Sequence, residues 1–178
     1  MLNGEAIRLR HVRERDLDAL YDFHTDIASR GDFYPLDTIG EPTFKKEFEE
    51  KGFWGREEGT LLIVDDCDTI LGEIQFFRTL QHLDELELGY RLYSTEHAGK
   101  GIASEAVRLM TTYLFEQKRF NRIRLMIHPD NVASRRVAAK CGYQHEGTCR
   151  GTWYNRGRYH DCEVYAMTRD DFNRMQAD

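Results

Sequence analysis

A long amphipathic helix pattern with a strand pattern on each side most constrains the fold of this chain. Apolar side chains recur at helical spacing from Ile102 to Leu114. Residues 86–92 instead alternate between apolar and polar side chains, and residues 122–127 form another strand pattern after the helix. Strands and helices in this arrangement indicate a sheet with helices packed against it.

The remaining elements follow from the same periodicities and from turn residues. Toward the N-terminus we expect a strand at 6–12, a helix at about 14–28, a second short helix through Phe44 and Phe48, and paired strands at 60–64 and 70–77. Toward the C-terminus we expect a helix that begins after Pro129-Asp130-Asn131 and ends at Gly142, long strands at 143–153 and 159–168, and a short helix from Asp170. The predicted fold class is α+β, a mixed sheet with helices on it, in one domain that spans residues 1–178.

The composition is that of a protein with its own hydrophobic core. The chain has 178 residues, and 40% of them are hydrophobic. The N-terminus is too charged for a secretory signal, and no stretch approaches the ~18 uninterrupted apolar residues of a membrane span. The four cysteines form no CxxC pair and the seven histidines are scattered. We therefore expect a soluble, cytoplasmic protein with reduced thiols, no bound metal and no membrane partner.

Charge is distributed unevenly along the chain. The net charge of −6 argues against general nucleic-acid binding. Residues 97–140 carry nine Lys and Arg against three Asp and Glu, whereas residues 1–96 carry eleven against twenty-two. A basic middle in an acidic protein suggests a bound polyanion of modest size, and the acidic part suits a cationic partner. Alternatively, the charged side chains cluster by chance on helix faces that are exposed to solvent, and they bind no ligand.

Two short segments carry residues suited to ligand chemistry, and the first is Gly99-Lys100-Gly101, between a strand and the long helix. Glycines there allow backbone N–H groups to converge on an anion, and the helix N-terminus adds partial positive charge. In the alternative interpretation, the glycines form a turn and bind no ligand. Their spacing matches neither of the common nucleotide-binding fingerprints.

The second segment runs from His128 to Val137. Asp130 or Asn131 can cap the following helix, with Ser134 as an ordinary first-turn residue. In a functional interpretation, the Asn131 amide and the Ser134 hydroxyl lie one turn apart and bind one elongated ligand. Two arginines, at 135 and 136, would then attract its phosphates.

In this order and spacing, these segments closely resemble the GNAT acetyltransferases, particularly the Rim-type branch that acetylates the N-termini of ribosomal proteins. Three motifs carry the resemblance: residues 86–92 (LELGYRL), 97–106 (HAGKGIASEA) and 131–143 (NVASRRVAAKCGY), the last followed by Glu146-Gly147. The resemblance covers nearly the whole chain. It implies a central, twisted, mostly antiparallel sheet flanked by helices, and direct transfer of an acetyl group from acetyl-CoA to a primary amine in a ternary complex.

The resemblance also implies where acetyl-CoA binds. Its pyrophosphate would lie on the backbone of Ala98, Gly99, Lys100, Gly101, Ile102 and Ala103. Its pantetheine arm would lie near Leu92 and Tyr93, with contacts from Asn131 and Ser134 and added charge from Arg136. The family usually has Arg or Gln where this chain has Ala98. Because the loop binds mainly through N–H groups, we expect weaker or slightly shifted binding there.

Four side chains are candidates for catalysis. Glu146 is the first candidate for the general base that removes a proton from the amine, and Glu87 is the second, acting directly or through water. Ser134 would protonate the departing thiolate, with Tyr143 as the alternative acid. A backbone N–H near Leu92 would stabilise the oxyanion.

Aromatic residues in predicted loops are candidates for the acceptor site, and we expect some of them to belong to the core instead. They are Phe33, Tyr34, Trp54 and Trp153, with Phe53 and Tyr154 beside them and Glu87 as a polar contact. Together with the acidic first half, they favour an amine that carries positive charge or an apolar group. A small-molecule amine and a peptide N-terminus both fit, in a monomer or a homodimer. The competing hypotheses are a non-catalytic module that senses acyl-CoA and a nucleotide-binding protein.

Overall fold

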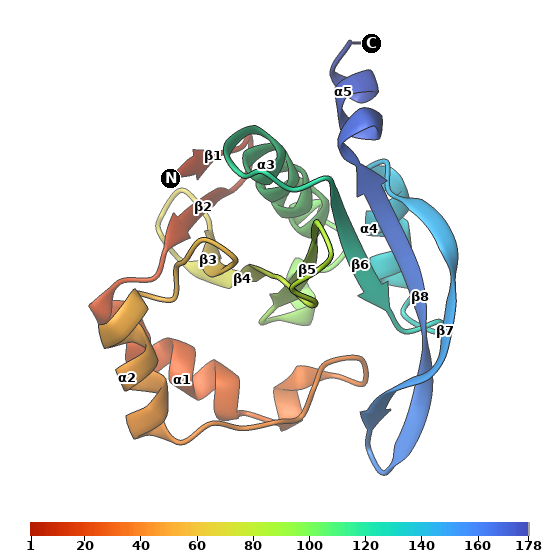
Figure 1. The fold of residues 1–178 in the computed structure, drawn as a ribbon. Helices are drawn as coiled ribbons and strands as arrows, with labels where there is room; N and C mark the ends of the chain where they lie inside the picture. Colours follow the sequence, from red (N-terminus) through yellow and green to blue (C-terminus); the bar gives the residue numbers. More distant parts are fainter. Residues whose placement is uncertain (178) are drawn as a thin grey trace.

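The computed structural model describes residues 1–177, which form one eight-stranded sheet in the order β1-β2-β3-β4-β5-β6-β8-β7 (Figure 1). The strands are β1 (Leu2–Asn3), β2 (Arg8–His11), β3 (Glu58–Val64), β4 (Ile70–Phe77), β5 (Glu85–Leu92), β6 (Arg122–Ile127), β7 (Gln144–Asn155) and β8 (Arg158–Thr168). The helices are α1 (Leu17–Thr25), α2 (Glu41–Lys51), α3 (Ile102–Gln117), α4 (Val132–Lys140) and α5 (Arg169–Ala177). Short 3₁₀ turns, η1 (Glu14–Asp16), η2 (Ala28–Arg30) and η3 (Thr95–His97), connect them.

The predicted α+β fold with a mixed sheet is confirmed. The strands expected at 70–77 and 122–127 match β4 and β6 residue for residue. Strand β1 was not predicted because two residues are too few to show a period. The helix expected at about 14–28 is divided into η1, α1 and η2, because Asp26 leaves the helical region with φ −74° and ψ 85°. No helix among residues 1–177 is long and apolar enough to cross a membrane.

Strands β5 and β6 form a parallel pair, and their pairing is short. It runs from Glu85 opposite Arg122 to Glu87 opposite Arg124. Beyond these residues β5 stays paired with β4 up to Leu92, while β6 stays paired with β8 up to residue 127. Each strand is therefore held on its outer side while the two separate, so the opening between them is fixed by the sheet.

Helices cover both faces of the sheet. The larger hydrophobic cluster lies with α3, α4 and α5 and includes Leu88 and Met110, while the smaller lies with α1 and α2 and includes Leu20 and Leu62. In Figure 1, α1 and α2 lie below the sheet and α3 lies above it. The divergence of β5 and β6 therefore opens between two packed layers.

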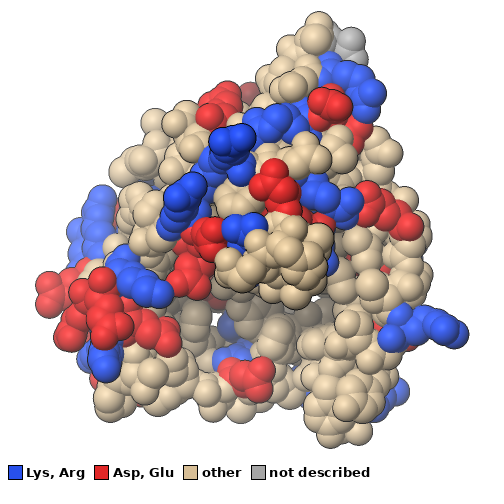
Figure 2. Space-filling view, viewed as in Figure 1, with Lys and Arg blue, Asp and Glu red and all other residues tan. Residues whose placement is uncertain are grey.

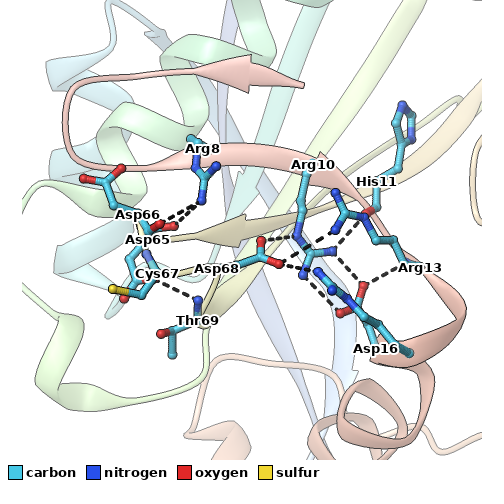
Figure 3. A network of polar contacts seen from close by, with 11 residues as sticks. Arg8, Arg10, His11, Arg13, Asp16, Asp65, Asp66, Cys67, Asp68 and Thr69 are labelled. Atoms are coloured by element: carbon cyan, nitrogen blue, oxygen red, sulfur yellow. Dashed lines mark hydrogen bonds and ion pairs between the residues drawn. The ribbon is translucent and has the colours of Figure 1, made fainter.

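Arg10 on β2 is buried and ties three segments together (Figure 3). Its guanidinium donates to both carboxylate oxygens of Asp16, at 2.7 and 3.0 Å, and to Asp68 of the β3–β4 turn at 2.6 Å. Burial opposes ionisation of Asp16, but the hydrogen bonds from Arg10 and from the Arg13 backbone N–H, together with the charge of Arg10, outweigh it and hold the pKa of Asp16 below its usual value. This paired charge fixes the start of α1 against the sheet.

Replacing Asp16 with Asn is expected to lower the free energy of unfolding by about 3 kcal/mol, because the buried Arg10 guanidinium loses its buried carboxylate partner and keeps only the partly exposed Asp68. The matched control is Arg15→Met, which removes an exposed contact with Asp68 and should cost less than about 1 kcal/mol. Urea unfolding followed by tryptophan fluorescence measures both variants. Because the pKa of Asp16 is lowered on folding, its stabilisation is complete above the ordinary carboxyl pKa and is lost as pH falls through the folded value. Equal losses in the two variants would contradict the role of burial.

Candidate active site

A cavity of about 420 Å³ lies where β5 and β6 separate. Its lining comes from both strands, from β4, from the first turn of α4, from the segment after η2 and from the β7–β8 hairpin. Figure 2 shows this side of the molecule hollowed between the segment that follows α1 and the sheet. The cavity is thus bounded by segments that are far apart in the sequence.

Side chains alternate along β5, so the cavity receives groups from both faces of the sheet. Leu88 belongs to the larger core cluster, and Tyr90 packs against that cluster on the same face. Glu87 and Arg91 project to the other face, where the Arg91 guanidinium donates to the Phe23 carbonyl of α1 at 3.1 Å. Glu87 and Tyr90 both line the cavity from their opposite faces.

The first turn of α4 forms one wall of the cavity. The Asn131 side chain caps the helix, because its Oδ1 accepts a hydrogen bond from the Ser134 backbone N–H at 3.1 Å. Within residues 1–177, the Asn131 Nδ2 donates no hydrogen bond, and both residues line the cavity. The amide therefore holds the helix with one end and keeps the other available for a ligand.

A ladder of alternating charges crosses β5, β6 and β7. Glu87 accepts from Arg124 at 2.9 and 3.0 Å, and Arg124 also contacts Glu85 at 3.0 Å. Arg122 contacts Glu85 as well and donates to Glu146 at 2.7 and 3.1 Å. The two carboxylates predicted as general bases are thus the two ends of one ladder, and only the Glu87 end lines the cavity.

The environment of Glu87 favours proton acceptance. Burial raises the pKa of Glu87 above its ordinary value, and the positive charge of Arg124 opposes this shift without cancelling it. A carboxylate with a raised pKa is a stronger base than an exposed one. Glu146, by contrast, is exposed on the edge strand β7.

Aromatic side chains line the other side of the cavity. Phe33 and Tyr34 come from the segment after η2, and Trp153 comes from β7. His128, at the end of β6, lies between them, with ring centroids 5.0 Å from Phe33 and 5.9 Å from Trp153. These residues form an apolar wall that faces the Glu87 side of the cavity.

The tip of the β7–β8 hairpin holds the segment that carries this wall. The buried Asn155 places its Nδ2 at 3.4 Å from the Asp32 carbonyl and at 3.5 Å from the Tyr34 carbonyl. Arg156 donates to the Gly31 carbonyl at 3.0 Å. Figure 1 shows the segment after α1 reaching across toward this hairpin. The position of the wall therefore depends on the hairpin tip.

Two histidines join the hairpin to β6 through a directional chain of hydrogen bonds. The Asp130 backbone N–H donates to His128 Nδ1 at 3.1 Å, which makes that nitrogen an acceptor. His128 Nε2 must then carry the proton that it donates to His160 Nδ1 at 2.9 Å. His160 Nε2 in turn donates to the Asn155 carbonyl at 3.1 Å. The Asp130 N–H, the two imidazole rings and the Asn155 carbonyl all have hydrogen-bond partners when each ring carries one proton, on Nε2.

A buried polar cluster fixes Tyr34 from behind. The Tyr34 hydroxyl donates to Glu73 at 3.1 Å, and His24 contacts the other oxygen of Glu73 at 2.8 Å. Burial opposes the negative charge on Glu73, but the contact with His24 and the hydrogen bonds from Tyr93 and Tyr34 together outweigh it and lower the pKa of Glu73. The Arg91 guanidinium lies 4.9 Å from the centre of the Tyr34 ring. The ring is therefore held by its edge and by its face.

The loop before α3 offers backbone donors. Gly99 and Gly101 have positive φ angles of 75° and 84°, a conformation that side chains rarely adopt. Among the described residues, their N–H groups donate to no carbonyl, whereas the Ala98 N–H donates to Thr95 at 3.0 Å. Free donors at the N-terminus of a 16-residue helix are suited to binding an anion.

Several predicted site residues lie elsewhere. The Tyr143 hydroxyl pairs with Thr111 at 2.7 Å in the core, because β7 begins beneath α3. Trp54 packs against Phe76 with ring centroids 5.3 Å apart, in the larger core cluster. Neither these residues nor Glu146 lines the cavity.

The residues predicted to contact the cofactor also differ in their surroundings. Leu92 packs against the larger core cluster. Tyr93 stacks on Phe23 at 4.0 Å, on the face that α1 covers. Arg136 is exposed on α4, near Asn131 and Ser134 in the chain.

Sequence reasoning gave no site role to several residues that line the cavity, among them Gln75, Tyr90, Arg124 and His128. Tyr90 and Arg124 belong to strands that had been predicted, and strand alternation alone leaves open which face borders a cavity. His128 follows the last residue of β6. It lies in the second candidate segment, but only the residues after it were given a role. Among residues 1–177, no group of three or more His, Cys, Asp or Glu side chains is arranged to hold a metal ion.

Comparison with known proteins identifies a family by sequence and a shared fold by structure. The sequence profile of the family described as "Acetyltransferase (GNAT) domain" matches residues 6–144. The putative ribosomal N-acetyltransferase YdaF of Bacillus subtilis is 33% identical over 186 residues, covering 95% of this chain and 94% of that protein. The spermidine N-acetyltransferase of Vibrio cholerae, solved with CoA and spermine, superposes with a TM-score of 0.81 at 16% identity, covering 96% and 99% of the two chains. Mycobacterium smegmatis RimJ, solved with CoA-disulfide, gives a TM-score of 0.78 at 21% identity, covering 96% and 88%.

Asn155→Ala is expected to accelerate amide hydrogen exchange in residues 31–37 by about fivefold, because it removes two of the hairpin's hydrogen bonds to that segment, which contribute about 1 kcal/mol together. Hydrogen exchange followed by mass spectrometry measures the change. Tyr159→Ala is the matched control, since its side chain is exposed on the same hairpin. Unchanged exchange in the Asn155 variant would show that the segment is held by its own contacts.

Proposed function

This chain belongs to the acetyltransferase (GNAT) family, and from that premise we propose that the cavity between β5 and β6 is its active site, with Glu87 as the general base. The chain is an acetyl-CoA-dependent N-acetyltransferase. It moves an acetyl group to an amine, and the family membership argues against a module that only senses acyl-CoA.

The position of Glu87 is the observation that carries this proposal. Its carboxylate lies in the cavity, on the face of β5 that α1 and the segment after η2 cover. Asn131 and Ser134 border the same cavity from α4. A donor that enters along α4 and an acceptor that enters along the aromatic wall would meet beside Glu87.

The residues along the donor side fit acetyl-CoA, which supplies the acetyl group as an activated thioester. The free N–H groups of Gly99 and Gly101 suit its pyrophosphate, and the basic segment 97–140 adds attraction. The Asn131 Nδ2 suits a carbonyl of the pantetheine arm. Ala98 contributes little, because its N–H is already bonded to Thr95.

For the acceptor we propose a primary amine flanked by an apolar group. Phe33, Tyr34 and Trp153 provide the apolar surface, and Glu87 accepts the proton that the amine must lose. An N-terminal α-amine and a small-molecule amine both satisfy this description. The relatives include a putative ribosomal N-acetyltransferase and, at the level of fold, a spermidine N-acetyltransferase, which supports testing both classes.

Thiol release from acetyl-CoA in the presence of candidate amines tests the function. The panel should contain peptides with free N-termini, the same peptides with blocked N-termini, and spermidine. Release with a free but not a blocked peptide would identify an α-amine acceptor, and release with spermidine alone would identify a small amine. Acetyl-CoA that raised the melting temperature without release by any amine would favour a binding module instead.

Glu87→Gln is expected to lower kcat/KM by about 10²–10⁴-fold, the range of a lost general base, while acetyl-CoA binding is largely kept. Wild-type activity should fall as pH drops through the raised pKa of Glu87, and the variant should lose this dependence. Glu146→Gln is the discriminating variant, because it removes the carboxylate at the other end of the same ladder. A large loss for Glu146→Gln with a small one for Glu87→Gln would restore Glu146 as the base.

A further inference from the structure

Gln75 is a polar residue of the cavity that the reaction proposed above does not use. It lines the cavity from β4, and its side chain is half-buried. The charged side chains nearby are engaged with others, since Glu73 contacts His24 and Tyr34, and Glu87 contacts Arg124. Among residues 1–177 the Gln75 amide has no hydrogen-bond partner. Its donor and acceptor ends are therefore open to a ligand in the cavity.

Gln75 lies on the same face of the sheet as Glu87. Its neighbour at the alternate position of β4 is Glu73, which contacts His24 on α1, so this is the face that α1 covers. In the register of β4 and β5, Gln75 is opposite Gly89, two residues from Glu87 along β5. The amide and the proposed base therefore point to the same side, and both border the acceptor part of the cavity.

The glycine opposite Gln75 lets its amide reach across to β5. Because Gly89 has no side chain, Gln75 lies over it, with Nε2 3.1 Å and Cγ 3.3 Å from the position that a Cβ atom would take. Alternate side chains on one face of a strand are about 7 Å apart. A gap of that size admits one hydrogen bond of about 2.9 Å at each end, with two polar atoms of one small group between them. An amine nitrogen and the oxygen of a carbonyl on the adjacent carbon are such a pair.

A second cavity, with a volume of about 620 Å³, begins beyond Gln75. Its lining comes from α2, β3 and β4, and Gln75 and Phe77 line both cavities. An acceptor that places its amine at Glu87 and directs its chain toward the second cavity must pass the Gln75 amide. The group on the carbon next to the amine is the first to reach it.

We propose that Gln75 is a specificity-determining residue, whose amide donates a hydrogen bond to a carbonyl oxygen on the carbon next to the reacting amine. The proposal rests on the active site and the base proposed above. It makes the preferred acceptor an α-amino carbonyl compound. A polyamine is disfavoured, because its next nitrogen is farther along the chain and, when protonated, only donates hydrogen bonds.

Gln75→Met separates this contact from packing, because Met keeps an unbranched side chain and removes the amide. The probes are a peptide with a free N-terminus and the same peptide with its first peptide bond replaced by a trans alkene, which has no carbonyl oxygen. For the peptide, the variant should lower kcat/KM by about fivefold, mainly through KM, because a hydrogen bond made by both substrate and transition state is lost. For the alkene analogue, kcat/KM should equal that of the wild type. Thiol release from acetyl-CoA measures both.

Gln117→Met is the matched control, since Gln117 is exposed at the end of α3 and lines neither cavity. It should leave kcat/KM unchanged for both acceptors. Equal losses for both acceptors in the Gln75 variant would show that the side chain acts through packing, which would overturn the proposal. An unchanged kcat/KM for the peptide would overturn it too. A melting temperature close to wild type confirms that the variant is folded, which a replacement of similar size permits.

An amino-acid amide, added to the panel, identifies the source of the α-amino carbonyl group. An amide that is turned over as well as the peptide would indicate a small-molecule acceptor, and a much better peptide would indicate a chain N-terminus. In either case Gln75→Met should lower kcat/KM for the better acceptor by about fivefold. The absence of this loss would contradict the role of Gln75.

The outcomes also separate this proposal from the one on which it rests. Thiol release by the wild-type protein with spermidine, but with no peptide or amino-acid amide, would overturn the role of Gln75 and leave the active site standing. Release with no amine at all would overturn both. A large loss in Glu87→Gln, combined with a Gln75→Met variant that treats the peptide and its alkene analogue alike, would overturn Gln75 alone.

Discussion

The short parallel pairing of β5 and β6 is the constraint on which the rest of this structure depends. A parallel pair requires a crossover, and α3 supplies it while burying the larger core beneath it. The pairing ends at Glu87 and Arg124, yet β4 and β8 continue to hold the outer edges of the two strands. The opening is thus built during folding, so a ligand meets a site whose walls are already in place.

Charge sharing explains why Glu87 can be a base although it is ion-paired. Arg124 is divided between Glu87 and Glu85, and Arg122 between Glu85 and Glu146. No carboxylate at the end of the ladder has a cation to itself, so burial prevails at Glu87. Arg10 is also shared, between Asp16 and Asp68, but Asp16 meets it with both oxygens, and there the charged form of the carboxyl is favoured. Similar residue pairs therefore serve reactivity in one place and stability in another.

Periodicity predicted most of the fold, because strands and helices bury one face in a regular pattern. The glycine loop, Asn131, Ser134 and Glu87 were candidates from the sequence, since each lies in a motif of fixed spacing, and the last three line the cavity. The choice between Glu87 and Glu146 was not predictable, because strand order decides which carboxylate reaches the cavity. The same applies to Trp153 and Trp54, which look alike in sequence but lie in the cavity wall and the core. Tyr90 was missed because the alternation of a strand does not show which of its faces borders a cavity.

The two sides of the cavity are built by separate stretches of chain. The aromatic wall comes from the segment after η2 and from the hairpin, and the bonds from Asn155 and Arg156 that fix it run within those two parts. The opposite side comes from the first turn of α4. A duplicated copy of such a gene can therefore accumulate changes in the first set of segments and keep the second intact. New substrates become reachable in evolution without reinventing the chemistry that activates them.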